Sequence, residues 1–235
     1  MLSMTRAGAT LSAPFHAVRA MADALSPAQS PPTVFIVDDD VSVREAVQTL
    51  VELEGWEARA FASAGAFLRE PPAAGASCLV LDVSLPDLSG LDLQDRLVGR
   101  DDMPTIFITG FGDIPMTVRA MKAGAAEFLT KPLSDDVLVN AISAALTRSR
   151  IAVEARAALR ALQARYASLT QREREVMALV VSGLLNKQVG GELGISEITV
   201  KAHRGRVMEK MRARSFADLV RISQRLGYGS SASDQ

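Results

Sequence analysis

The sequence is poor in cysteine and has no long apolar run. Cys78 is the only cysteine among the 235 residues, so an internal disulfide is excluded and a reducing compartment, the cytoplasm, is expected. Because it lies in the apolar run CLVL, Cys78 is interpreted as a small core residue. No run reaches the roughly 18 apolar residues of a membrane helix, so we expect no segment to span a membrane.

The first 32 residues lack the continuous apolar core of a secretory signal, because polar residues, Pro14 and Arg19 interrupt it. They are rich in Ala, Ser and Pro and carry three charges. We predict a flexible leader at 1–32, which is either a disordered arm or sequence upstream of a true start at Met21. Residues 229–235 are predicted to be a disordered tail.

The charges are divided unevenly along the chain. With 48% hydrophobic and 23% charged residues, the composition is that of a globular protein long enough for two modest domains. Residues 33–150 hold 18 acidic and 10 basic residues, a net charge of −8, whereas residues 151–235 hold 8 and 14, a net charge of +6. This asymmetry indicates a cation-dependent site joined to a module that binds a polyanion.

From Thr33 onward, short apolar runs alternate with helical patterns five times. This predicts an α/β fold, a doubly wound five-stranded parallel sheet over residues 33–150. The runs CLVL and TIFI are apolar throughout, as strands buried on both faces should be.

Residues 144–168 contain no Pro or Gly and continue the helical pattern, so 151–165 is predicted to be a helical linker. Leu159, Leu162, Tyr166 and Leu169 recur at helical spacing, which suits either a partner helix or a solvated connector. Residues 166–228 then read as a small all-α domain of four helices.

Reactive side chains follow four of the predicted strands. They are Asp38, Asp39 and Asp40 after the first, Asp82 after CLVL, Thr109 after TIFI and Lys131 after AEFLT. The carboxyl ends of parallel strands share one edge, where ligands bind in such sheets. Carboxylates from two strands can share Mg²⁺, which prefers oxygen ligands.

These residue types suit phosphoryl transfer, with Asp82 as the nucleophile. An ionised carboxylate needs no base to activate it. Each residue taken alone has a simpler interpretation: a solvated turn for the Asp run, a strand-end hydroxyl for Thr109 and a surface charge for Lys131. Their occurrence at successive strand ends favours a site.

Over roughly residues 33–150 the chain resembles the receiver domain of two-component response regulators. The matching motifs are VDDD with Arg44 following, LDVSLPDLSG, ITGFGD and EFLTKP, at intervals of 43, 27 and 22 residues between Asp39, Asp82, Thr109 and Lys131. The resemblance implies that Asp82 accepts a phosphoryl group and that Asp38, Asp39 and Asp82 bind Mg²⁺. It also implies that Thr109 and Lys131 contact the phosphoryl group.

The same resemblance makes Thr109 and Phe128 switch residues and Lys131–Pro132 a cis peptide bond. Asp40 is expected to begin the next helix in solvent rather than to bind metal. Gly90 is expected to supply backbone angles that other residues resist, in the loop after Asp82.

In the last third, GELGIS is the pattern of a turn between two helices, with Gly194 ending one and Ser196 capping the next. Together with NKQV and TVKAH, it resembles the LuxR-type helix-turn-helix domain of the FixJ/NarL class. The expected DNA-binding residues are Thr199, Lys201, Ala202, Arg204, Gly205 and Arg206.

On a helix over 198–212, Val200, Val207 and Met211 would face the core. Gly190, Gly191 and Gly205 depart from the family pattern, each at a helix-interior cost of about 1 kcal/mol relative to Ala.

The resemblance implies a cytoplasmic response regulator that a sensor histidine kinase phosphorylates on Asp82. Its other expected partners are promoter DNA, RNA polymerase and, after phosphorylation, a second copy of the chain. It would not be an enzyme beyond slow loss of its own phosphoryl group.

One alternative is a phosphatase with an aspartyl nucleophile, although Ser84 stands where such enzymes carry a second Asp. The other is a receiver fold that serves only as a dimerisation platform.

Overall fold

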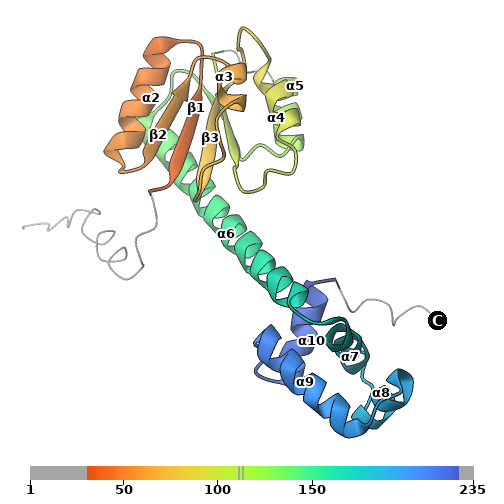
Figure 1. Ribbon diagram of the computed structural model, residues 1–235. Coiled ribbons are helices and arrows are strands. Elements are labelled where there is room, and N and C mark those ends of the chain that lie inside the picture. Colours follow the sequence, from red (N-terminus) through yellow and green to blue (C-terminus); the bar gives the residue numbers. More distant parts are fainter. Residues whose placement is uncertain (1–30, 111, 113, 228–235) are drawn as a thin grey trace, which may run out of the picture.

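The computed structural model describes residues 31–110, 112 and 114–227, which form two parts joined by one long helix (Figure 1). The predicted leader, apart from residues 31 and 32, and the predicted tail lie outside the described residues.

The N-terminal part is built on a parallel sheet in the strand order β2-β1-β3-β4-β5, which confirms the predicted doubly wound α/β fold. The strands are β1 (Thr33–Val37), β2 (Glu57–Phe61), β3 (Ser77–Asp82), β4 (Thr105–Thr109) and β5 (Glu127–Thr130). β2 lies on one side of β1, and β3, β4 and β5 lie on the other, so the strand order reverses between β1 and β3. Ligands bind in such sheets at the carboxyl ends of the two strands that flank this point.

Helices cover both faces of the sheet, which is why the central strands β1, β3 and β4 are buried along their whole length. On one face, Val34 and Ile36 of β1 pack under α2 (Val41–Leu53) and the start of α6 (Asp135–Ala167). On the other face, Phe35 and Val37 pack under α3 (Ala64–Leu68), α4 (Gly90–Arg96) and α5 (Ile114–Lys122). Figure 1 shows these two layers on either side of the strands.

Helix α6 belongs to the cores of both parts. Its first half is fastened to the base of the sheet by buried Ser149, whose hydroxyl accepts the Ser77 N–H at 2.8 Å and donates to the Asp102 carbonyl. Leu162, near its other end, is buried in the C-terminal core, and Tyr166 packs against the same cluster. The predicted linker, 151–165, thus lies inside one continuous helix. Of the predicted apolar stripe, Leu162, Tyr166 and Leu169 pack in the C-terminal core of the same chain.

The C-terminal part consists of the four predicted helices after α6: α7 (Gln171–Val181), α8 (Asn186–Leu193), α9 (Glu197–Met211) and α10 (Phe216–Arg225). One cluster joins α6, α7, α9 and α10, and a smaller one joins α7, α8 and α9 around Val189 and Val200. Among all the helices within the described ranges, none has the length and apolar character needed to cross a membrane.

Candidate functional site

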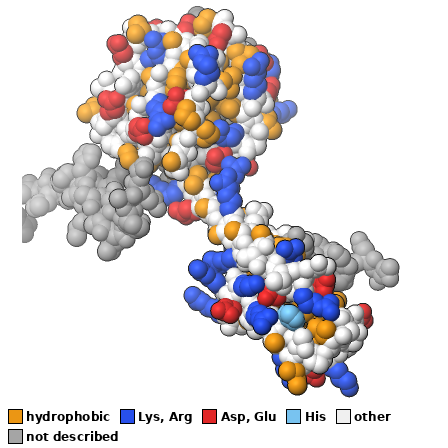
Figure 2. Space-filling view, in the orientation of Figure 1, with side chains coloured by type: hydrophobic (Ala, Val, Ile, Leu, Met, Phe, Trp, Pro, Cys, Tyr) orange, Lys and Arg blue, Asp and Glu red, His pale blue; other side chains and the backbone are white. Residues whose placement is uncertain are grey.

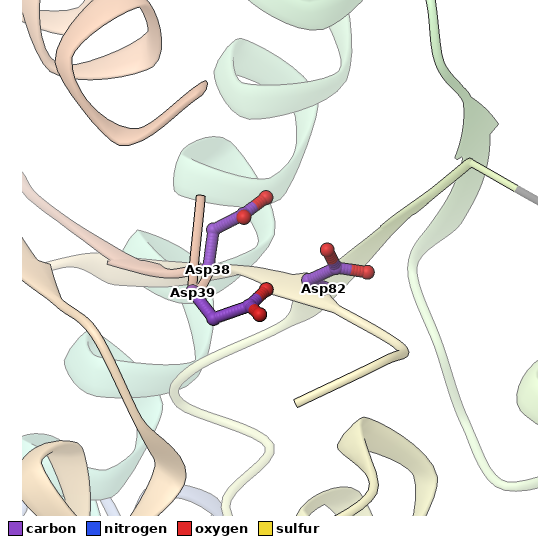
Figure 3. A group of neighbouring side chains, drawn as sticks. All are labelled: Asp38, Asp39 and Asp82. Carbon is purple, nitrogen blue, oxygen red and sulfur yellow. The ribbon is translucent and has the colours of Figure 1, made fainter. Parts of the chain in front are cut away.

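Three carboxylates gather where the neighbouring strands β1 and β3 end (Figure 3). Asp38 and Asp39 directly follow β1, and Asp82 is the last residue of β3. One carboxylate oxygen from each residue lies within 4.8 Å of the other two. Asp38 and Asp82 are buried, whereas Asp39 is exposed. The structure therefore brings together the three predicted ligands, and their hard oxygen atoms are the donors that Mg²⁺ prefers.

Lys131, which follows β5, places its ammonium group between two of these carboxylates. Its Nζ atom lies 2.7 Å from Asp38 Oδ2 and 2.8 Å from Asp82 Oδ2. Burial raises the pKa of Asp38 above its ordinary value, although the hydrogen bond from Lys131 opposes the rise. Burial alone would lower the pKa of Lys131, but its hydrogen bonds to Asp38 and Asp82 outweigh this and the pKa is raised. The peptide bond between Lys131 and Pro132 is cis, as expected.

Local hydrogen bonds fix the backbone of the acidic run. The Arg44 guanidinium donates from Nη1 to the Asp38 carbonyl at 2.7 Å and to the Asp39 carbonyl at 2.9 Å. Asp40 accepts the N–H of Ser42 at 2.8 Å and is the N-cap of α2, so it begins the helix as predicted. Arg44 is a positioning residue to which the sequence reasoning assigned no role. The available signal was its place on the first turn of the helix after the acidic run.

Thr109 and Phe128 lie on the two strands beyond β3. Thr109, the last residue of β4, is buried, and its carbonyl accepts the Lys131 N–H at 2.8 Å. Phe128 of β5 is half-buried, and its ring centroid lies 6.1 Å from that of Phe107. Thr109 is therefore held at the same edge of the sheet as the carboxylates, and Phe128 packs toward the face covered by α5.

Gly90 is needed for space rather than for unusual backbone angles, which corrects the prediction made from sequence. Gly90 is not among the described glycines with a positive φ. A Cβ atom at this position would lie 2.3 Å from the Asp82 carbonyl oxygen and 3.0 Å from the Val83 Cα atom. The start of α4 thus rests directly on the backbone of Asp82, and the Gly90 N–H donates to the Val83 carbonyl at 2.9 Å.

The loop between Asp82 and Gly90 is also fastened to α3. The carboxylate of Asp87 accepts the N–H groups of Ala64 and Gly65 at 3.2 and 2.8 Å. These hydrogen bonds, that of Gly65 above all, hold the pKa of Asp87 below its ordinary value. Asp87 is a second positioning residue that the sequence reasoning missed, because its partners are more than 20 positions away along the chain.

In the C-terminal part, α8, a turn and α9 form the predicted helix-turn-helix. Gly194 ends α8 in the left-handed conformation at φ 65°, and Ser196 caps α9 by accepting the Thr199 N–H. Val200, Val207 and Met211 are buried, as predicted. Lys and Arg side chains stand out on this part of the molecule in the region of α9 (Figure 2).

The predicted DNA-binding residues of α9 fall into two groups. Lys201, Ala202, Gly205 and Arg206 are exposed. Thr199 and Arg204 are half-buried and have partners within the chain: Thr199 bonds to Ser196, and Arg204 bonds to Asn186 at 3.2 Å and lies over the Phe216 ring. The structure thus brings four of the six to the outward face. The sequence reasoning passed over Ile198, whose side chain is exposed on the first turn of this helix.

The two adjacent glycines of α8 differ in their surroundings. A Cβ atom on Gly190 would lie 2.7 Å from the Ile195 carbonyl oxygen, in the turn before α9. A Cβ atom on Gly191 would meet nothing within 4 Å. Gly190 therefore allows α8 and the turn to approach each other, and only Gly191 is a helix-weakening residue without a structural reason.

Replacing these glycines with alanine is expected to change stability in opposite directions. Gly190→Ala should lower the free energy of unfolding of the C-terminal part by about 1–2 kcal/mol, because the clash outweighs the gain in helix propensity. Gly191→Ala should raise it by about 0.5–1 kcal/mol. Urea unfolding followed by far-ultraviolet circular dichroism measures both changes, and shifts of the same sign would contradict the assignment.

Both parts of the chain match known families. The model of the response regulator receiver domain matches residues 34–143, and that of the bacterial regulatory proteins of the luxR family matches residues 167–223. Nodulation protein W of Bradyrhizobium diazoefficiens is 51% identical over 203 residues, which cover 86% of this chain and 89% of that protein. Response regulator protein TmoT of Ectopseudomonas mendocina is 46% identical over 194 residues, covering 82% and 88%. The solved structure of response regulator StyR has 46% identity and a TM-score of 0.76, and the match covers 83% of this chain and all of that one.

Proposed function

Because the chain belongs to the two-component response regulators that join a receiver domain to a LuxR-family DNA-binding domain and regulate transcription, we propose that Asp82 accepts the phosphoryl group that switches it. The observation that carries this proposal is the position of the Lys131 ammonium group, 2.7 Å from Asp38 and 2.8 Å from Asp82. This arrangement places a nucleophilic oxygen beside a cation, as phosphoryl transfer requires, and adds two further carboxylates that can bind a metal ion.

The donor in this proposal is a phosphohistidine of a sensor histidine kinase. An Asp82 carboxylate oxygen attacks the phosphorus atom, the P–O bond forms and the P–N bond breaks. The imidazole leaves with the electron pair and takes up a proton. Lys131 is placed to pair with an oxygen of the transferred group, because its ammonium already touches the Asp82 carboxylate. The Thr109 hydroxyl, at the end of the adjacent strand, would bind another phosphoryl oxygen.

Asp38, Asp39 and Asp82 would hold Mg²⁺, and their clustered oxygens within 4.8 Å of one another support this assignment. When bound, Mg²⁺ would offset the negative charge on the phosphoryl oxygens. The chain's own residues prepare the site: Arg44 holds the backbone of the acidic pair, and Lys131 offsets part of the carboxylate charge.

The switch would work through Thr109 and Phe128. A phosphoryl group on Asp82 draws Thr109 and Lys131 toward it, and Phe128, which is only half-buried beside Phe107, changes position. The surface around α5 and β5 then favours a dimer. This is a shift between two populations of the same chain.

In the dimer, two copies of α9 would enter the major groove at paired half-sites. Lys201, Ala202, Gly205 and Arg206 are the residues that we assign to bases and nearby phosphates, since all four are exposed. Thr199 and Arg204 are assigned to phosphates at the margin, where their bonds within the chain already hold them.

RNA polymerase is the proposed partner at the promoter, and the cytoplasm is the proposed location. The free thiol of buried Cys78 is compatible with a reducing compartment. We propose no catalytic turnover beyond slow hydrolysis of the aspartyl phosphate.

Beryllofluoride with Mg²⁺, which mimics a phosphorylated aspartate, tests the proposed switch. We expect the full chain to shift from monomer toward dimer, since Thr109 and Lys131 would close around the bound group. Light scattering coupled to size exclusion measures the mass, and a fluorescent promoter fragment measures DNA affinity.

Beryllofluoride without Mg²⁺ and Mg²⁺ without beryllofluoride are the matched controls, and chelation should reverse the change. The alternative, a receiver fold that serves only as a dimerisation platform, would be favoured if the mass and the DNA affinity stay unchanged in every condition and no Mg²⁺ binding is detected.

A further inference from the structure

Helix α9 presents a strip of non-charged residues on its outward face. Ile198, Ala202 and Gly205 follow one another at spacings of four and three, so they share one side of the helix. All three are exposed. The buried residues of α9, such as Val200 and Val207, lie on the opposite side.

Ile198 is the most exposed large hydrophobic side chain in the described C-terminal part. It is 80% exposed, compared with 71% for Leu185 and 39% for Phe216. The Phe216 ring is partly covered by Arg204, and Leu185 lies before α8. Single exposed aliphatic residues are common on proteins, so exposure alone carries no function. What distinguishes Ile198 is its position as the second residue of the helix that would enter DNA.

The N-terminal residues of a recognition helix are those that contact base edges. In the major groove, the base-edge group that suits an aliphatic side chain is the 5-methyl group of thymine. Lys201, one turn further along, is held near the same end by an ion pair with Glu197 at 3.1 Å. Beyond it, the small Ala202 and the open space beside Gly205 leave no bulky side chain to keep the helix away from the bases.

We propose that Ile198 is a specificity-determining residue that packs on a thymine methyl group in each half-site. This proposal rests on DNA binding through α9, and it adds a direct apolar contact to the basic residues of that helix. Burying one methyl group contributes about 0.8 kcal/mol, which corresponds to roughly a fourfold change in affinity for each half-site.

The test begins by selecting binding sites from random DNA with the beryllofluoride-activated full chain. Each thymine of the selected site is then replaced in turn by deoxyuridine, which lacks the methyl group. For the unmodified protein we expect one position in each half-site where this replacement weakens binding about fourfold. The Ile198→Ala variant should bind the thymine and deoxyuridine sites equally at that position.

Val98→Ala is the matched control, because Val98 is also 80% exposed but lies in the receiver domain. It should keep the full difference between thymine and deoxyuridine. Salt-dependent binding to non-specific DNA should be the same in all three proteins, which shows that Ile198→Ala leaves the domain folded. If Ile198→Ala retains the discrimination, or if no deoxyuridine replacement weakens the unmodified protein, the proposal for Ile198 is overturned. If the activated protein binds no DNA at all, the proposed DNA-reading function itself fails.

Discussion

Asp82→Asn is expected to abolish formation of an aspartyl phosphate from a cognate kinase or a small phosphodonor. The asparagine amide has nearly the shape of the carboxylate but no charged oxygen to attack phosphorus. Its carbonyl oxygen can still accept the Ser84 N–H, which lies 3.1 Å from Asp82 Oδ1, and Lys131 retains its contact with Asp38. The fold should therefore persist while labelling falls to background. The measurement is acid-stable, base-labile phosphoryl incorporation, checked by intact mass.

Asp40→Asn is the matched control for that experiment. Asp40 belongs to the same acidic run but caps α2, and asparagine caps helices about as well as aspartate. Labelling should continue in this variant. Label that persists in Asp82→Asn would identify a different acceptor, and steady turnover of a free phosphomonoester by the unmodified protein would revive the phosphatase alternative.

Gly90→Ala is expected to have the largest structural effect in the receiver domain. The added Cβ atom would lie 2.3 Å from the Asp82 carbonyl oxygen and 3.1 Å from the Asp82 carbonyl carbon. These atoms belong to the backbone, so no side-chain rotation can relieve the clash. We expect a loss of about 3 kcal/mol in the free energy of unfolding, at the upper end of the usual cost of overpacking. Because the backbone of Asp82 must move, phosphorylation should also slow.

Gly75→Ala provides the comparison within the same domain. A Cβ atom on Gly75 would meet nothing within 4 Å, so this variant should be unchanged or more stable by about 0.5 kcal/mol. Urea unfolding and the rate of labelling are measured for both variants. Equal stability and equal rates for Gly90→Ala and Gly75→Ala would contradict the role assigned to the contact at Gly90.

The glycines show where sequence reasoning reached its limit. A glycine after Asp82 suggested special backbone angles, and Gly190 suggested a weakened helix. In both cases the reason is the approach of a second backbone segment, the carbonyl of Asp82 or that of Ile195. The sequence shows where a glycine stands, but it does not show which backbone segment lies against that glycine in the fold.

The receiver site was more predictable, because most of its residues stand directly at the ends of strands that the sequence identifies. Runs of apolar residues located the strands, and parallel strands place their carboxyl ends on one edge. Asp38, Asp82, Thr109 and Lys131 could therefore be grouped before any contact was known. The positioning roles of Arg44 and Asp87 were not predicted, since each acts through hydrogen bonds with backbone groups that the residue pattern does not specify.

The sequence by itself determined the order and type of the elements, the helix caps at Asp40 and Ser196, and the division into an acidic receiver and a basic DNA-binding domain. These features depend on side-chain periodicity and on hydrogen bonds between residues a few positions apart. Tertiary structure alone decided that α6 is shared by both cores, that Gly90 rests on Asp82 and that Ile198 faces outward beside Ala202. Each of these depends on which segments pack together, and packing brings together residues that are distant along the chain.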